Sequence, residues 1–339
     1  MRLVSYLELP VETSAPKVKL GALLGDDCVI DLAVAQTWAQ GACGFHAKPL
    51  PRTMLELLRS WEDSIAHLRA LLNVLPGKEC LYLKGARRQP VARLRREILL
   101  IAPLPTPLTL REFEGFEGHV RAMYGLRRRG IPEEWYEMPV FSYGNPFTVF
   151  GPDEVISPPH REASLDYELQ VACVIGKQGR DIPPEEAEQY IAGYMILNNW
   201  ATRDIQRLEM RLGIGPAKGK DFATTLGPAI VTPDELADRR IGEGADLRYD
   251  LAMVARVNGV ERSTGNLRDI HWTFARMIAH ASQGVMLHPG EVIASGTVEG
   301  GSLLEQGAGE KGEWLRPGDR VEMEVEGLGK LDTRIVEPA

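Results

Sequence analysis

The sequence predicts a β-rich α+β protein, with a small N-terminal α+β domain over residues 1–103 and a larger domain over residues 104–339. The length of 339 residues suffices for two domains of about 150 residues each. After the first hundred residues, short strand-like segments recur with helices inserted between them. A proline-rich stretch that begins at Pro103 follows a buried strand over residues 98–102, and we place the domain boundary there.

Composition and charge argue against several classes of protein. The hydrophobic fraction of 44% and the charged fraction of 25% are typical of a globular chain, which excludes extensive disorder. The 39 basic and 47 acidic residues give a net charge of −8, so we expect no nucleic-acid partner. No apolar run approaches the roughly 20 residues that span a bilayer, so we expect no membrane partner. The 4 cysteines lie far apart, which argues against a zinc site or disulfide framework and fits a cytoplasmic protein.

In the N-terminal part, the residue pattern predicts strands followed by one long helix. Residues 1–6 alternate between apolar and polar, as a strand does, and residues 20–32 contain two short strands joined by a turn at residues 25–27. Apolar residues recur at helical spacing over Thr53–Leu75, which predicts a single helix. The proline and glycine that follow it provide a stop signal.

The larger domain alternates between predicted strands and helices. An Asn-Gly turn within residues 251–260 predicts a β-hairpin. The other predicted strands are residues 167–175, 291–295 and 320–325. The predicted helices cover residues 184–195 and 270–282, and a further helix start lies at residues 232–235.

Polar residues gather in five segments that are separated in the sequence. None of the segments is diagnostic alone, because isolated polar groups are common on surfaces. They are residues 111–119, 166–170, 198–206, 219–222 and 295–305.

Taken together and in order, these segments resemble the fumarylacetoacetate hydrolase family from about residue 100 to the end of the chain. The most specific segments are residues 215–222, Gly-Pro-Ala-Lys-Gly-Lys-Asp-Phe, and residues 295–297, Ser-Gly-Thr. The resemblance implies a mixed β-roll or distorted β-barrel, usually in a homodimer. It also implies hydrolase or lyase activity on a small-molecule oxoacid, such as C–C bond cleavage of an acylpyruvate. The implied cofactor is a divalent metal, Mg²⁺ or Mn²⁺ with Ca²⁺ as an alternative, which acts as a Lewis acid.

The resemblance assigns a role to each matching residue. His119 matches the general base, Glu305 the carboxylate that orients it, and Lys220 the group that stabilises an oxyanion. The positions that match substrate-contacting residues of the family are Arg203, Gln206, Thr297, Ser142 and Tyr143. Ser142 is a departure, because the family often has tyrosine there.

The metal-ligand positions depart further from the family. They are Glu112, Glu168, Gln170 and Asn199, where the family has four carboxylates. Two acids have thus become amides, and one aspartate has become the longer Glu112. Because hard divalent cations prefer anionic oxygen, we expect weakened metal binding or none. For Gln170 and Asn199, a structural hydrogen-bonding role is as plausible as metal ligation.

Three functions therefore remain open. The first is a hydrolase or lyase that acts beside a ketone, as the retained His119, Glu305 and Lys220 indicate. The second is a metal-independent isomerase, cyclase or dehydratase, which the amides favour. The third is a non-catalytic binding protein that keeps the pocket. The basic run at residues 127–129 is either part of a lid over the site or a solvated helix end.

Overall fold

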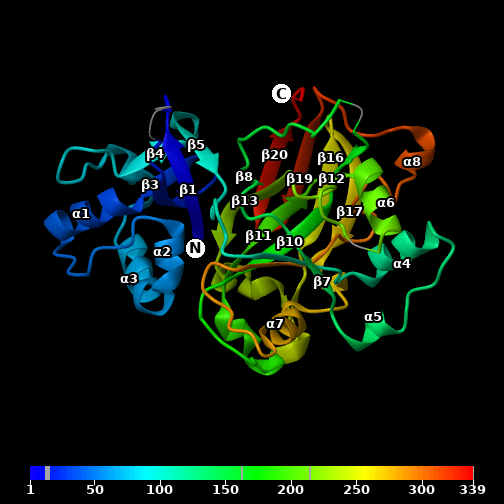
Figure 1. The fold of residues 1–339 in the computed structure, drawn as a ribbon. Coiled ribbons are helices and arrows are strands. Elements are labelled where there is room, and N and C mark those ends of the chain that lie inside the picture. Colours follow the sequence, from blue (N-terminus) through cyan, green and yellow to red (C-terminus); the bar gives the residue numbers. More distant parts are fainter. Residues whose placement is uncertain (12–15, 162, 214, 339) are drawn as a thin grey trace.

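An open twelve-stranded sheet organises the chain in the computed structural model, which describes residues 1–11, 16–161, 163–213 and 215–338 (Figure 1). The main path across the sheet is β4 (Ala92–Leu94), β3 (Cys28–Asp31), β2 (Lys19–Leu24), β1 (Arg2–Glu8), β13 (Thr224–Val231), β11 (Ile191–Asn199), β10 (Leu169–Ile175), β18 (Val292–Ala294), β6 (Leu110–Phe113) and β7 (Phe141–Tyr143). Beside this path, β5 (Ile98–Ile101) pairs with β1, and β8 (Val149–Phe150) pairs with β13. Since β1 pairs with β13, strands from both ends of the chain share one sheet.

A second sheet of four strands packs against the C-terminal part of the first. Its order is β17 (Val260–Asn266), β16 (Ala252–Val257), β19 (Arg320–Val325) and β20 (Gly329–Arg334). One buried cluster joins both sheets and helix α7 (Phe274–Ser282), and it includes Val171, Tyr194, Met253, Met277 and Met323. Two small ribbons are β9 (Leu165–Asp166) with β12 (Ala201–Thr202), and β14 (Arg240–Ile241) with β15 (Arg248–Tyr249). The predicted β-rich α+β fold class is confirmed, and the large sheet stays open rather than closing into a barrel.

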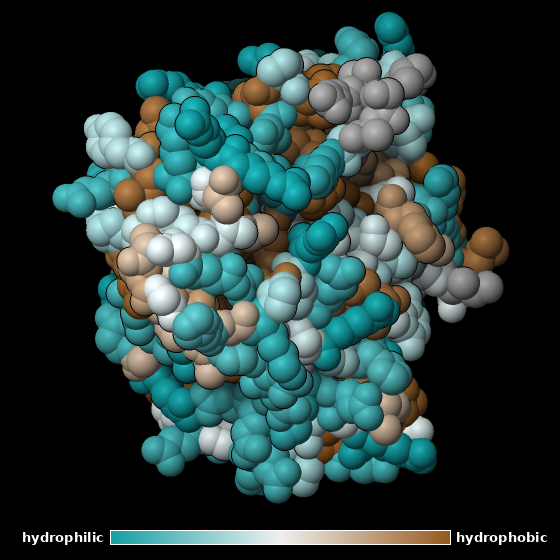
Figure 2. Space-filling model, turned by 90° about the vertical axis from the view of Figure 1, so that its left-hand side faces the viewer, coloured by the Kyte–Doolittle hydropathy of each residue, from teal (hydrophilic) through white to brown (hydrophobic). Residues whose placement is uncertain are grey.

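The N-terminal helices cover a face of the large sheet through a separate buried cluster, which includes Leu57, Leu68 and Met195. These helices are α1 (Leu32–Cys43), α2 (Met54–Arg59), α3 (Trp61–Asn73) and the 3₁₀ turns η1 (Gly77–Tyr82) and η2 (Arg95–Glu97). Their outer surface is mainly hydrophilic, as Figure 2 shows. The single helix predicted over Thr53–Leu75 is wrong in one respect, because it breaks at Ser60. That residue leaves the helical conformation, and its hydroxyl donates to the Glu56 carbonyl at 3.1 Å.

Two further helix predictions need correction. The helix predicted over residues 184–195 is only a 3₁₀ turn, η3 (Pro184–Tyr190), after which the chain enters strand β11. All nine residues of β11 are buried, and a strand buried on both faces carries a continuous apolar run that periodicity cannot tell from a buried helix. The helix predicted from residue 270 begins at Phe274, because the Thr273 hydroxyl caps it by accepting from the Arg276 N–H.

The remaining helices lie in the connections between strands after residue 110. They are α4 (Glu117–Gly125), α5 (Glu134–Glu137), α6 (Arg203–Arg211), α8 (Ala308–Lys311), η4 (Pro233–Arg239), η5 (Gly244–Asp246) and η6 (Leu267–Asp269). Helices α4, α6 and α8 gather on one side of the sheets, away from α1–α3 (Figure 1). None of the helices in the described ranges has the length and apolar character needed to cross a bilayer.

Candidate active site

The predicted site residues converge where the central strands of the large sheet meet helices α4 and α6. Glu112 comes from β6, Gln170 from β10 and Asn199 from the end of β11. Helix α4 contributes His119, and the turn that follows β18 contributes Thr297. The strand order β11-β10-β18-β6 brings these four strands side by side, so residues from distant parts of the sequence line a single wall.

A cavity of about 210 Å³ opens at this point. Its polar lining includes most of the predicted residues, namely Glu112, His119, Ser142, Glu168, Arg203, Gln206, Lys220 and Thr297. The Ser-Gly-Thr turn needs its glycine, because Gly296 has φ of +80° and a Cβ there would overlap the Phe113 carbonyl oxygen. The turn therefore approaches the wall closely and delivers Thr297 into the cavity.

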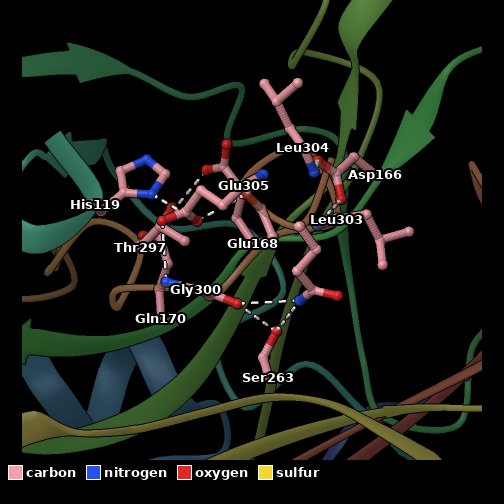
Figure 3. Close-up of polar contacts among 12 residues, drawn as sticks. His119, Asp166, Glu168, Gln170, Ser263, Thr297, Gly300, Leu303, Leu304 and Glu305 are labelled. Carbon is pink, nitrogen blue, oxygen red and sulfur yellow. Dashed lines mark hydrogen bonds and ion pairs between the residues drawn. The ribbon is translucent and has the colours of Figure 1, made fainter. Parts of the chain in front are cut away.

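A chain-derived cation occupies the centre of the carboxylate cluster. The Lys220 Nζ lies 2.7 Å from Glu168 Oε2 and 3.2 Å from Glu112 Oε1. The Gln170 Nε2 donates to the same two oxygens at 3.1 and 2.6 Å, and Figure 3 shows Gln170 beside Glu168. This amide orientation is the favourable one, since the opposite orientation would place its oxygen against two carboxylates. The Gln170 Oε1 is consequently turned away, and it is buried without a hydrogen-bond partner among the described residues.

The electrostatics of the cluster keep opposite charges in contact. Burial is the largest influence on the pKa of Glu168 and raises it, but the Lys220 and Arg203 charges prevail and hold the pKa well below its usual range. Burial raises the pKa of Glu112, and the Lys220 charge opposes the rise without cancelling it. Burial lowers the pKa of Lys220, but the charges of both glutamates bring the net pKa above its usual value. The cluster therefore holds a stable ammonium against a firmly ionised Glu168.

These residues, as arranged, do not fit a divalent metal. Across the described residues, no group of three or more His, Cys, Asp and Glu side chains is placed to hold an ion. The two carboxylates that face one another are already bridged by Lys220 and by the nitrogen of Gln170. Two neutral amides stand where the family pattern has acids. The position therefore has two fewer negative charges, which is the amount that would neutralise one divalent ion. Bound Mg²⁺ or Mn²⁺ would require Lys220 to leave and Gln170 to turn.

His119 and Glu305 form a buried pair at the cavity wall (Figure 3). The His119 Nδ1 lies 2.9 Å from Glu305 Oε2, although its N–H is not aligned well enough for a good hydrogen bond. The glutamate is itself held firmly, because the Ser302 hydroxyl donates to Oε2 at 2.8 Å and the Gly300 N–H donates to Oε1 at 3.0 Å. Since Glu305 takes the Nδ1 side, the imidazole Nε2 is left to exchange protons with a bound molecule.

Arg203 connects the carboxylate cluster to a second buried acid. Its Nε donates to Asp166 Oδ2 at 2.8 Å, and its Nη1 lies 2.8 Å from Glu168 Oε1. Burial lowers the pKa of Arg203, but the two carboxylates outweigh it and the net pKa is raised, so the guanidinium stays charged. Its Nη2 is buried and has no partner in the described part of the chain. A donor of this kind in the wall of a cavity is ready to bind an anionic oxygen.

The remaining predicted residues differ in their placement. Gln206 accepts a hydrogen bond from Arg203 Nη1 at 2.8 Å, and Thr297 receives a long contact from Gln170 Nε2 at 3.4 Å. Ser142 lines the cavity. Its neighbour Tyr143 is 66% exposed and packs against the Arg111 guanidinium, so the structure does not bring it to the cavity with the others.

Sequence reasoning assigned no role to two residues that organise the site. Asp166 is fully buried and accepts the Leu303 and Leu304 N–H groups at 2.8 and 3.1 Å (Figure 3). Because it also accepts from Arg203 Nε, it ties the turn that carries Glu305 to helix α6. Ser302 stands three residues before Glu305, a Ser-x-x-Glu spacing that could have suggested this contact. Arg127 also lines the cavity, and residues 127–129 are exposed just after the end of α4, so both interpretations of the basic run stay open.

Comparison with known proteins places this site in a family. Residues 110–336 match the family model described as fumarylacetoacetate (FAA) hydrolase C-terminal. The oxaloacetate tautomerase YisK of Bacillus subtilis is 27% identical over 321 residues, covering 93% of this chain and 95% of that protein. The human mitochondrial oxaloacetate tautomerase FAHD2A is 29% identical over 291 residues, covering 85% of this chain and 81% of that protein.

A solved structure confirms the fold. The maleylpyruvate hydrolase of Sphingobium sp. SYK-6, in complex with manganese(II) ion and pyruvate, superposes with a TM-score of 0.66 at 22% identity and full coverage of both chains. The family model covers the strands and helices that carry every predicted site residue. The chain therefore belongs to the fumarylacetoacetate hydrolase family.

Proposed function

We propose that the chain is an enzyme that moves a proton at the carbon beside the ketone of a 2-oxoacid, and that it does so without a divalent metal. The observation that carries the proposal is the buried His119–Glu305 pair, which faces the same cavity as two cationic donors, Lys220 and Arg203. A base opposite fixed positive charge suits a reaction that passes through an enolate. Two relatives named oxaloacetate tautomerase support this reaction class.

The proposed reaction uses only side chains of this chain. His119 Nε2 removes a proton from the carbon next to the ketone, and the C–H electron pair becomes the C=C bond of the enolate. The negative charge moves to the former ketone oxygen, where Lys220 and the unpartnered Nη2 of Arg203 stabilise it. The imidazolium then returns the proton to that oxygen, which yields the enol and the original base. Substrate and product are isomers, so no other reactant is consumed.

C–C bond hydrolysis of an acylpyruvate is the second candidate. The observation that favours it is the retained combination of His119, Glu305 and Lys220, because a base can equally activate water against a carbonyl. The two candidates differ in their products, since hydrolysis consumes water and releases two acids. Product analysis therefore separates them.

The decisive experiment follows exchange and cleavage in chelator-treated protein. Oxaloacetate, pyruvate and acetylpyruvate are incubated in D₂O with and without added Mn²⁺, and NMR records deuterium entering the carbon beside the ketone and any cleavage products. We expect exchange above the uncatalysed rate in chelator, with little gain from Mn²⁺. Exchange that depends strictly on added metal would overturn the proposal that the reaction needs no metal. Absence of both exchange and cleavage with all of these acids would overturn the proposal that the chain is an enzyme of this class.

We expect kcat/KM in the same assay to depend on pH. Burial is the largest influence on the pKa of His119 and lowers it, but the contact with Glu305 and the charges of Glu305, Glu168 and Glu114 bring the net pKa above its ordinary 6.5. A general base acts only when unprotonated, so kcat/KM should fall as the pH drops through this raised value. In Glu305→Gln the fall should move to lower pH, because the raising charge is gone. An unchanged profile in that variant would contradict the assignment of Glu305.

A further inference from the structure

A second cavity of about 720 Å³ opens directly beside the candidate active site. Both cavities are lined by Met123, Arg127, Arg203, Gln206 and Met210, so these residues form a shared boundary. Helices α4 and α6 flank the second cavity, and Gly309 of α8 reaches it. A molecule held at His119 and Lys220 could therefore extend past Arg203 into this larger space.

The larger space is strongly basic, although the whole chain carries a net charge of −8. We name it the arginine groove after the four exposed arginines that line it together with Arg203, which are Arg127, Arg129, Arg207 and Arg211. Within the described ranges, none of these four forms an ion pair with a carboxylate; Arg127 instead lies 3.1 Å from the Met210 sulfur. Among the described residues that line it, the one acid is Asp204, which is engaged by the Ser164 N–H at 3.0 Å and by His160 at 3.0 Å.

Apolar side chains complete the lining of the arginine groove. They are Met123, Leu126, Met210, Leu304 and Trp314. Leu126 is 55% exposed and Met210 36% exposed, which leaves apolar surface available to a ligand. A lining of this kind suits an elongated apolar group that ends in a negative charge, because the apolar part is removed from water while the anion meets arginines.

We infer that the arginine groove binds the distal part of the substrate, an extended acyl or aromatic group that ends in a carboxylate or phosphate. This inference rests on the proposed function, since the reactive 2-oxoacid end is held in the adjoining cavity. Arg203 lines both cavities, so it marks the junction between the reactive end of such a substrate and its distal part. A substrate that fills only the first cavity, such as oxaloacetate, would leave the groove unused.

The test measures binding rather than turnover, so that it does not depend on the identity of the reaction. Calorimetry on the His119→Ala variant compares acetylpyruvate with long-chain acylpyruvates that end in methyl, carboxylate or phosphate. We expect the acids with an anionic end to bind about tenfold more tightly than the acid with a methyl end, because several exposed charge pairs can together contribute that much affinity. The advantage should shrink as salt rises, because exposed pairs are screened. Comparison of the carboxylate and phosphate ligands shows whether the groove prefers a dicarboxylic acid or a group attached to a phosphorylated carrier.

The double variant Arg207→Ala/Arg211→Ala should abolish the preference for an anionic end. The matched control is Arg121→Ala on α4, since Arg121 is exposed, pairs with Glu117 and lines neither cavity. No preference in the unaltered groove, or a preference that survives the double variant, would overturn the inference. Dissociation of an oligomer in the double variant with an unchanged preference would assign the groove to a second copy of the chain and overturn it as well. Failure of acetylpyruvate and all longer acids to bind would count against the proposed function instead.

Discussion

Changing Gln170 to Glu and Asn199 to Asp together should create a divalent-metal site at a position where we expect the natural chain to bind Mn²⁺ and Mg²⁺ weakly or not at all. The two substitutions add two negative charges beside Glu112 and Glu168, and the affinity of hard cations increases with the number of anionic ligands. A glutamate at position 170 would also lose the amide nitrogen that now bridges both carboxylates. We expect Mn²⁺ to bind at least about a hundredfold more tightly to the double variant, a difference of about 2.8 kcal/mol.

Calorimetry of chelator-treated protein measures this difference, and the electron paramagnetic resonance signal of Mn²⁺ reports binding independently. The two single variants serve as controls, because each adds only one charge and should give an intermediate affinity. Lys220→Gln provides a second approach, since it removes the ammonium that lies between the two carboxylates. Micromolar binding of Mn²⁺ to the unaltered protein would show that its amide oxygens suffice, and it would contradict the prediction.

Replacement of His119 by Ala should lower kcat/KM for the responsive 2-oxoacid by about 10²- to 10⁴-fold, the usual contribution of a positioned general base. The imidazole is the group in the cavity wall whose free nitrogen can take up a proton, because Lys220 and Arg203 keep their protons. The fold should tolerate the change, since His119 lies on one face of the cavity and contacts Glu305 through a single ion pair.

The matched control is His46→Ala, because His46 is exposed and lies among the N-terminal helices, far from the cavity lining. Added imidazole should restore part of the activity of His119→Ala by entering the space that the side chain vacates. Retention of full activity in His119→Ala would remove the proposed base. Equal losses in both histidine variants would indicate a general effect on the protein rather than a role in proton transfer.

The order of the short polar segments carried the resemblance from which the site residues were assigned. The structure brings His119, Glu305, Lys220, Arg203 and Thr297 to one cluster, and their roles stay predictions. Such segments are informative because a turn such as Ser-Gly-Thr demands both a special backbone conformation and a particular side chain. Strands bounded by clear turns, including the hairpin β16–β17, were predicted for the same local reason.

Features that depend on long-range contacts could not be predicted. Strand β11 has the composition of a buried helix, and only its position between β10 and β13 makes it a strand. The position of Lys220 between two glutamates, and the turn of the Gln170 amide toward them, arise from side-chain packing that no spacing reveals. From the sequence, Asp166 was only one acid within the polar segment of residues 166–170. Its bonds to residues 303 and 304 connect parts of the chain that are 137 and 138 positions apart.

The ammonium between Glu112 and Glu168 has a consequence for how the protein depends on its surroundings. An ion taken from solution occupies a site only to the extent that its free concentration exceeds its dissociation constant. Lys220 is instead part of the chain and is delivered by folding in a fixed one-to-one ratio. Every folded molecule therefore carries its positive charge, whatever the supply of magnesium or manganese. Under the proposed metal-independent function, the site would stay assembled when metals are scarce, and metal availability would not control it.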